Sequence, residues 1–250
     1  MPDPLVLGGL GGIAGLSSGL FGIGGALIAT PLLRLTGIEP LLALATPLPA
    51  VIPTALSASI AYWRHGLIRW DVAGWLLLTG LPGTVLGALA TRLVGGTALM
   101  VLTGALLLFV ALRMLGPERP STAGSPDAMP RRTLLLGTGV LAGFLGGLLA
   151  IGGGIIIVPA LVLWGRMPFK QALATSLLCV AGLALPGTIT HAMLGHIAAP
   201  LLLPFLAGSL PAAYLGAAVA TRLSSVLLRR LYGGALTVFA VYFLWTQLSG

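Results

Sequence analysis

The chain has few charged residues. Of its 250 residues only 7% are Asp, Glu, Lys or Arg, whereas 57% are hydrophobic and the mean hydropathy is +1.07. A soluble globular protein carries about a quarter of its residues as charged side chains, so a surface exposed mainly to water is excluded. Intrinsic disorder needs low hydrophobicity and high net charge, and it is excluded too. The sequence therefore predicts an integral membrane protein whose solvent is the lipid bilayer.

Residues that often carry chemistry are also scarce. Cys179 is the single cysteine, which excludes an intramolecular disulfide and a cysteine-cluster metal site. The three histidines are scattered, and neither an HExxH nor a Walker motif is present. We therefore expect no enzyme activity, no metal and no cofactor. The net charge of +8 arises from single positive residues between apolar runs rather than from a basic patch with aromatics, so no nucleic-acid partner is expected.

Eight apolar runs divide the chain, and a membrane-spanning helix needs about 20 mostly apolar residues. The runs cover residues 5–35, 41–63, 72–93, 98–115, 133–164, 172–194, 197–223 and 226–248. The longest polar stretch, at 116–132, is rich in Pro, Ser and Arg, which predicts a solvated linker. We expect a first transmembrane repeat over 1–115, a cytoplasmic linker over 116–132 and a second repeat over 133–250.

The two halves of the chain repeat one another. The segment GLSSGLFGIGGALIATP at 15–31 aligns without a gap with GFLGGLLAIGGGIIIVP at 143–159. Further on, ATPL at 45–48 aligns with ATSL at 174–177. The order and the near-constant offset of these matches indicate a duplication, and many secondary transporters are built from such repeats.

Two glycine-rich GIGG segments ending in proline, each followed by an AT-x-L segment, resemble the sulfite exporter TauE/SafE family of bacterial membrane transporters. The resemblance covers nearly the whole chain. It implies a transporter in the bacterial inner membrane that moves sulfite, a sulfonate or a related sulfur-containing or organic anion. The sequence departs from the family's pattern at Ala26, where the second copy has Gly154, and at Pro47, where it has Ser176. These departures make the first half-site less polar than the second.

The glycines of the repeated segment have two interpretations. Close helix packing through small residues fits the four-residue spacing of Gly11, Gly15 and Gly19. Adjacent glycines at 24–25 and 152–154 favour instead a break in the helix, because each interior glycine costs about 1 kcal/mol relative to alanine. A second half-helix would begin near Ala26 or Ile155. Its first N–H groups lack intrahelical partners and carry the positive end of the helix dipole, which makes an anion site without a buried cation.

Hydroxyl groups follow each break and extend the predicted site. They either donate hydrogen bonds to the anion or bond to the backbone four residues earlier, as serine and threonine inside helices often do. The predicted substrate-binding residues are Gly24, Gly25, Thr46, Gly152, Gly153, Gly154, Thr175 and Ser176.

The positive residues indicate the topology. If all eight runs cross the membrane, the loops carry seven positive residues on one side and six on the other. If 5–35 and 133–164 are re-entrant, each repeat crosses three times and the residues divide eleven to two. The positive-inside rule favours the second arrangement, with both termini outside. The sequence thus predicts an all-α membrane bundle of two inverted repeats, each a re-entrant, broken hairpin plus three transmembrane helices, whose breaks meet near the bilayer midplane.

Three further residues keep two interpretations each. His65 and His191 lie at nearly matching places in the two repeats, where they either carry protons as the coupling ion or lie at the membrane interface without a role in transport. Cys179 either contacts a sulfur substrate or fills space in the core. The function is predicted to be alternating-access transport of a small anion. The alternatives are an anion channel with the same site and a membrane subunit that transports nothing.

Overall fold

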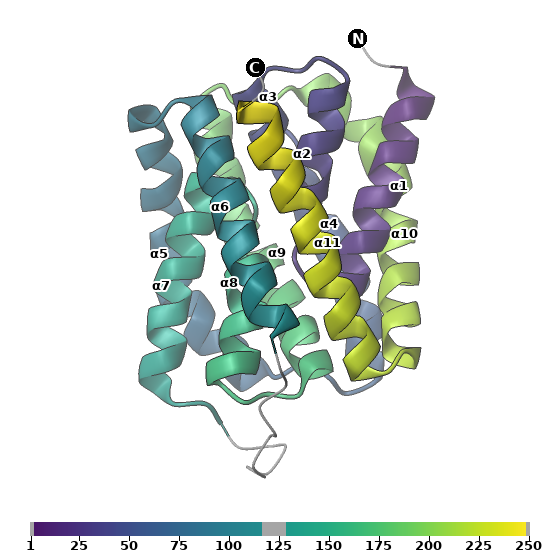
Figure 1. Cartoon of the computed structure of the whole chain (residues 1–250), viewed down its shortest axis with the longest axis vertical. Coiled ribbons are helices and arrows are strands. Elements are labelled where there is room, and N and C mark those ends of the chain that lie inside the picture. Colours follow the sequence, from purple (N-terminus) through teal and green to yellow (C-terminus); the bar gives the residue numbers. More distant parts are fainter. Residues whose placement is uncertain (1–2, 117–128, 249–250) are drawn as a thin grey trace.

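The computed structural model describes residues 3–116 and 129–248, and every regular element within these ranges is a helix (Figure 1). The helices of the first half are α1 (Pro4–Phe21), α2 (Ala26–Leu35), α3 (Pro40–Ala45), α4 (Leu48–Arg64), α5 (Trp70–Ala90), η1 (Thr91–Leu93) and α6 (Gly96–Leu115). Those of the second half are α7 (Arg132–Leu148), α8 (Gly154–Pro159), the π-helical η2 (Ala160–Trp164), α9 (Phe169–Met193), η3 (Ala199–Leu201), α10 (Leu202–Arg222) and α11 (Ser225–Leu248).

Seven stretches of the described chain are long and apolar enough to cross a membrane. They are Pro4–Phe21, Pro40–Arg64, Trp70–Leu93, Gly96–Leu115, Phe169–Met193, Ala199–Arg222 and Ser225–Trp245. Two shorter apolar stretches, Arg132–Leu148 and Gly154–Trp164, complete the bundle. The prediction of an all-α, multi-pass membrane protein is confirmed.

The runs at 5–35 and 133–164 each divide into two helices that fold back as a hairpin. In the first hairpin, a Cβ atom added to Gly25 would lie 3.5 Å from the carbonyl oxygen of Ala14, halfway along α1. In the second, a Cβ atom on Gly153 would lie 2.6 Å from the carbonyl oxygen of Ala142. Both contacts span eleven residues of sequence, so the two hairpins close at equivalent places.

The long helices pack mainly across the repeats. Helix α1 lies against α10, α7 against α5, α4 against α9, and α6 against α11. Exchanging the two halves converts the first pair into the second and leaves the other two pairs unchanged. The contacts of one half therefore match those of the other, as the duplicated sequence predicts.

Glycines explain how closely α1 and α10 approach. A Cβ atom on Gly11, Gly15 or Gly19 would overlap the α10 backbone at Phe205, Ser209 or Ala213. The same is true of α7 against α5, where Gly143 faces the carbonyl oxygen of Gly80. Small residues allow such close backbone contact between membrane helices. The four-residue glycine spacing is thus a packing pattern, as its periodicity predicts.

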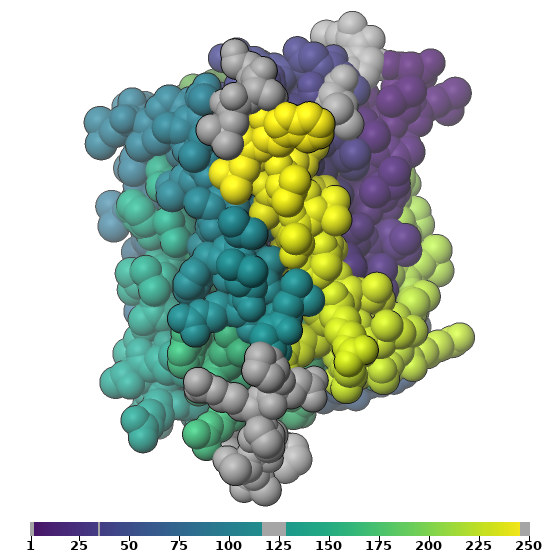
Figure 2. All heavy atoms as spheres, in the orientation of Figure 1, coloured from purple at the N-terminus to yellow at the C-terminus, as the bar shows by residue number. Residues whose placement is uncertain are grey.

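The two halves run in opposite directions in Figure 1. Helix α1 starts at the end of the bundle where α3 lies, here called the upper end, and α7 starts at the opposite, lower end. The neighbouring helices α6 and α11 are antiparallel, and Figure 2 shows their side chains packed together along one face. The first turn of α1 and the last turn of α11 share the upper end, whereas α6 ends and α7 begins at the lower end.

Positive side chains gather at the lower end. They are Arg64, Arg69, Arg113, Arg131, Arg132, Arg166, Lys170, Arg222, Arg229 and Arg230, whereas the upper end has Arg34 and Arg92. Arg119 lies outside the described residues, as does most of the linker expected at 116–132. The helix ends thus separate the described charges as the re-entrant arrangement requires.

The repeats differ where the sequence departs from symmetry. In the first repeat the chain breaks between α3 and α4 at Thr46 and Pro47. In the second repeat α9 continues through the equivalent Thr175 and Ser176. Proline has no N–H group with which to continue the helical hydrogen bonds, so Pro47 accounts for the break.

Candidate functional site

The two hairpins turn on residues with left-handed backbone angles. The positive φ values are 67° at Gly22, 80° at Gly24, 73° at Gly152, 80° at Gly153 and 51° at Ala150. Glycine adopts this region without the steric penalty of a Cβ atom. Helix α1 therefore ends at Phe21, and the N–H group of the following Gly22 donates to the Ser18 carbonyl oxygen at 2.9 Å. Helix α2 begins at Ala26 as expected, and α8 begins one residue before Ile155.

The two glycine turns meet inside the bundle. A Cβ atom on Gly154 would lie 2.8 Å from the carbonyl oxygen of Gly22 and 2.9 Å from the Cα atom of Ile23. One on Gly24 would lie 3.6 Å from the carbonyl oxygen of Ile151. Residues 22–26 and 150–155 are all buried. The structure thus joins segments that are 128 residues apart in the sequence.

Two valines that the sequence analysis did not single out cover the junction. Val51 of α4 and Val180 of α9 are equivalent in the repeat, and both are buried. The Cγ1 atom of Val180 lies 3.0 Å from the Cβ positions of both Gly24 and Gly152, and that of Val51 lies 3.5 and 3.8 Å from them. The repeat alignment pairs these valines, but their sequence gives no sign that they lie at the glycine turns.

The electrostatics of the junction come from the backbone. The N–H groups of Gly25, Ala26 and Leu27, at the start of α2, and of Gly154 and Ile155, at the start of α8, have no acceptor within residues 3–116 and 129–248. No Asp, Glu, Lys or Arg in these ranges is buried. Buried amide groups at a helix start are a ready site for an anion. The field here is positive without a cationic side chain.

The three predicted hydroxyl residues have different surroundings. Ser176 lies at the junction, where its Oγ donates to the carbonyl oxygen of Gly22 at 2.9 Å. Thr46 and Thr175 instead accept hydrogen bonds from loop amides, at 3.0 Å from Ala198 N and at 3.1 Å from Arg69 N. These two bonds are exact counterparts in the repeat. The structure thus brings Ser176 to the glycine turns and uses both threonines to hold loops.

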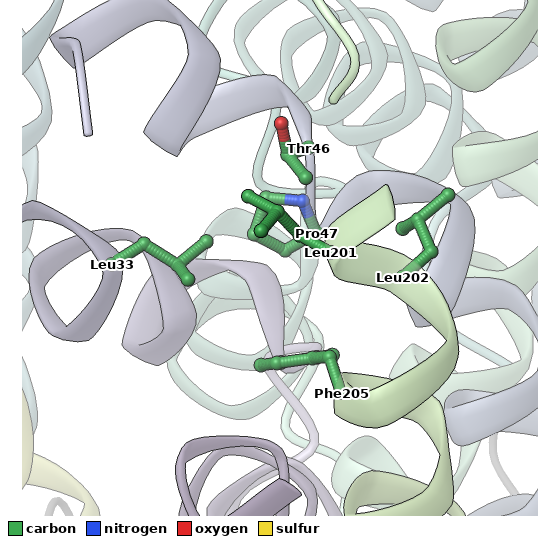
Figure 3. A pocket seen from close by; sticks show the side chains of 6 residues that line it. All are labelled: Leu33, Thr46, Pro47, Leu201, Leu202 and Phe205. Carbon is green, nitrogen blue, oxygen red and sulfur yellow. The ribbon is translucent and has the colours of Figure 1, made fainter. Parts of the chain in front are cut away.

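A small hollow near the upper end is apolar. It is lined by Leu33, Thr46, Pro47, Leu201, Leu202 and Phe205 (Figure 3). In Figure 3 the Thr46 hydroxyl points away from the other five side chains, in agreement with its bond to Ala198. The hollow offers an anion no polar partner, so it is not the predicted substrate site.

Comparison with known proteins identifies the family of this chain. Residues 7–243 match the family described as sulfite exporter TauE/SafE. The chain belongs to this family. A probable membrane transporter protein of Xylella fastidiosa (strain Temecula1 / ATCC 700964) is 34% identical over 247 residues, which cover 95% of this chain and 93% of the relative.

More distant relatives carry similar names. Probable membrane transporter protein YunE of Bacillus subtilis (strain 168) is 27% identical over 84% of this chain and 86% of its own length. A probable membrane transporter protein of Methanocaldococcus jannaschii is 25% identical over 94% of this chain and 93% of its own length. The match along nearly the whole chain agrees with the resemblance seen in the GIGG and AT-x-L segments.

The histidines of this TauE/SafE protein lie in contrasting places. His65 follows the last residue of α4 and is exposed. His191 of α9 is buried, and its Nε2 atom lies 2.9 Å from the carbonyl oxygen of Gly147. Its counterpart in the first repeat, Tyr62, donates from its hydroxyl to the carbonyl oxygen of Gly19 at 2.8 Å. His196, which the sequence analysis did not single out, lies 3.1 Å from His191, Nδ1 to Nδ1.

Ser18 is a second polar residue that the sequence analysis did not single out. Its hydroxyl is fully buried, one turn before Gly22, with no partner among the described residues. Its counterpart is Gly146, where a Cβ atom would lie 2.6 Å from the amide nitrogen of Gly153. The first hairpin therefore accepts a hydroxymethyl group where the second has room only for glycine. A lone serine in an apolar helix gives no sequence signal of this.

Cys179 lies in an apolar cluster that adjoins the second glycine turn through Leu183, whose Cδ1 atom lies 3.2 Å from the Cβ position of Gly153. The cluster contains Val72, Leu76, Leu161 and Leu183, and the cysteine is fully buried in it. The glycine turns belong to the other, larger cluster. The surroundings of the thiol are those of a packing residue.

Proposed function

We propose that the protein is a secondary transporter that binds one small anion between the two glycine turns and moves it by alternating access. The observation that supports this most is the meeting of the two buried glycine turns that precede α2 and α8, because the first amides of these helices lack acceptors among the described residues. Each amide that donates to a charged oxygen contributes about 1.5–3 kcal/mol. The substrate-binding residues in this proposal are Gly24, Gly25, Gly152, Gly153, Gly154 and Ser176, with Thr46 and Thr175 holding the loops beside them.

The substrate class comes from the family. A sulfur oxyanion such as sulfite, a sulfonate or a related organic anion has several oxygens that accept hydrogen bonds from converging amides. The junction favours an anion that carries no second, cationic group, since no described acidic side chain is buried there to pair with one. Sulfite and sulfonates are therefore the first substrates to test.

Packing at the junction favours a carrier over a channel. Val51 and Val180 pack against both turns and are themselves buried. An anion can enter only if α4 or α9 moves relative to the hairpins. In transporters with inverted repeats, such movement exposes a fixed site to each side in turn.

The charge separation supports one orientation. We assign the lower, positive end to the cytoplasm by the positive-inside rule, in a bacterial inner membrane. The opposed directions of α1 and α7 support inverted repeats related by an axis in the membrane plane. Both termini are then outside.

Removing one amide tests the site directly. Ala26 is the first residue of α2, the position at which proline is best tolerated in a helix. Ala26→Pro deletes one N–H group, and we expect at least a tenfold loss of affinity, equal to about 1.4 kcal/mol, for sulfite or methanesulfonate. The matched control is Ser225→Pro, at the exposed first residue of α11, which should bind normally.

Affinity is measured by thermal shift on purified protein with sulfite, sulfate, thiosulfate, sulfoacetate, methanesulfonate and carboxylates. Normal affinity in a folded Ala26→Pro protein would remove the helix start from the site. Counterflow in proteoliposomes then separates the mechanisms, because a carrier exchanges labelled for unlabelled anion and a channel does not. Absence of both binding and flux would favour the subunit that transports nothing.

A further inference from the structure

The end of α7 is held by a pair of histidines. The buried ring of His191 lies between two partners, the carbonyl oxygen of Gly147 at 2.9 Å from Nε2 and the Nδ1 atom of His196 at 3.1 Å from its own Nδ1. Gly147 is the penultimate residue of α7, five residues before Gly152 in the second glycine turn. The pair therefore connects the loop after α9 to one of the two hairpins that form the junction.

The partners fix the position of each proton. A carbonyl oxygen only accepts, so Nε2 of His191 must carry the hydrogen that it donates to Gly147. The Nδ1 atom of a neutral His191 then accepts from the Nδ1–H group of His196. This leaves Nε2 of His196 without a hydrogen. A proton can bind there without breaking either hydrogen bond, whereas a second proton would set two N–H groups against each other.

We propose that His191 and His196 form a binding site for a single proton, and that its occupancy controls the second glycine turn. The charge strengthens the bond from His196 to His191, because hydrogen bonds from ionised donors are stronger. It also polarises the N–H group that His191 donates to Gly147. The proton thus tightens α7 at the start of the turn and makes this hairpin less mobile.

Only one charged group acts closely on the pair. Arg92 of η1 lies near His196, and burial together with this positive charge holds the pKa of His196 below its usual range. The described helices packed against α9 keep their other charges at the lower end, at Arg64 of α4, Asp71 of α5, Arg132 of α7, and Arg229 and Arg230 of α11. Tyr242, in the upper half of α11, donates to the carbonyl oxygen of Pro31. The proton is therefore taken up on the acid side of neutrality.

The first hairpin has no such site. The equivalent bond is made by Tyr62 to Gly19, and Leu67 takes the place of His196. A tyrosine does not ionise near neutral pH, so acidification acts on one hairpin and leaves the other unchanged. If the proposed anion site is correct, this asymmetry would make protons a coupling ion. A proton that changes one half of the site changes the affinity for the anion, and the bound anion changes the affinity for the proton by the same factor.

Two measurements without any anion test the proton site. In the full-length protein with isotope-labelled histidine, NMR between pH 8 and 5 should show one shared protonation of His191 and His196. Arg92→Gln should raise the pH of the shared step. Independent titration of the two rings, or rings that stay neutral at pH 5, would overturn the proposal.

Hydrogen exchange reports the effect on the turn. After correction for the intrinsic pH dependence, amides at 149–153 should exchange at least threefold more slowly at pH 5.5 than at pH 8, and those at 22–25 should not change. His196→Gln removes the partly exposed ring and should abolish the difference, whereas His65→Gln should keep it. An equal response of both turns would overturn control by the pair. Neither measurement involves an anion. The proton site can therefore be confirmed or overturned even if the thermal-shift experiment detects no anion binding.

Discussion

Gly25 and Gly153 occupy equivalent positions, yet their replacement by alanine should change the stability of the protein by very different amounts. Each residue caps the helix that leaves its turn, α2 or α8. At Gly25 the backbone is right-handed, with φ of −69°, and the added methyl group would lie no closer than 3.5 Å to another atom. At Gly153 φ is 80°, and the methyl group would lie 2.6 Å from the carbonyl oxygen of Ala142.

The magnitudes follow from these two geometries. Gly25→Ala loses a favourable capping residue, at a cost of about 0.5–1 kcal/mol, and gains about 0.4–1 kcal/mol from a less flexible unfolded chain. The net change in unfolding free energy should be within about 1 kcal/mol of zero. Gly153→Ala places a Cβ atom in the left-handed region, at about 1–2 kcal/mol, and overpacks the hairpin, at about 1–3 kcal/mol. It should lose about 2–5 kcal/mol.

The assay is equilibrium unfolding in mixed micelles, with SDS as the denaturant and helix content as the signal. Wild type and both variants are compared at one detergent composition. Equal stability of the two variants, or a Gly153→Ala protein within about 1 kcal/mol of wild type, would show that the turns do not have the backbone described here. A destabilised Gly25→Ala protein would mean that α1 and α2 are closer than the structure places them.

Two further predictions concern a buried hydrogen bond and the topology. Tyr62→Phe removes the donor to the Gly19 carbonyl oxygen and should lower the unfolding free energy by about 1–2 kcal/mol. The control Tyr232→Phe removes a buried hydroxyl that has no partner among the described residues, and it should not lower the unfolding free energy. Equal effects of the two substitutions would contradict the hydrogen bond assigned to Tyr62. In a Cys179→Ala background, Gly116→Cys should react with impermeant reagents only from the cytoplasm, and Asp3→Cys only from outside. Labelling of both cysteines from one face would exclude the inverted arrangement.

Much of the fold could be predicted from the sequence because lipid imposes simple rules. Apolar runs of membrane length must be helices, since the backbone can satisfy its polar groups only internally. Adjacent glycines are poor helix interiors, so the breaks before Ala26 and Gly154 could be placed within one residue. Duplication identified which residues are equivalent, and with the glycine motifs it identified the family. The inversion of the repeats in the bilayer and the roles of the predicted site residues stay predictions.

Spatial relations between distant residues needed the tertiary structure. The sequence treated Thr46, Thr175 and Ser176 alike, but only packing shows that Ser176 reaches Gly22 while both threonines hold loops. It paired His191 with His65 by position, whereas the chain folds His196 against His191. Val51 and Val180 read as ordinary apolar residues, because a valine that lines a site has the same composition as one that fills a core. Periodicity and repeats determine which segments are helices and where the helices break. The side chains that then meet are set by contacts between residues far apart in the chain, and no local sequence pattern records these contacts.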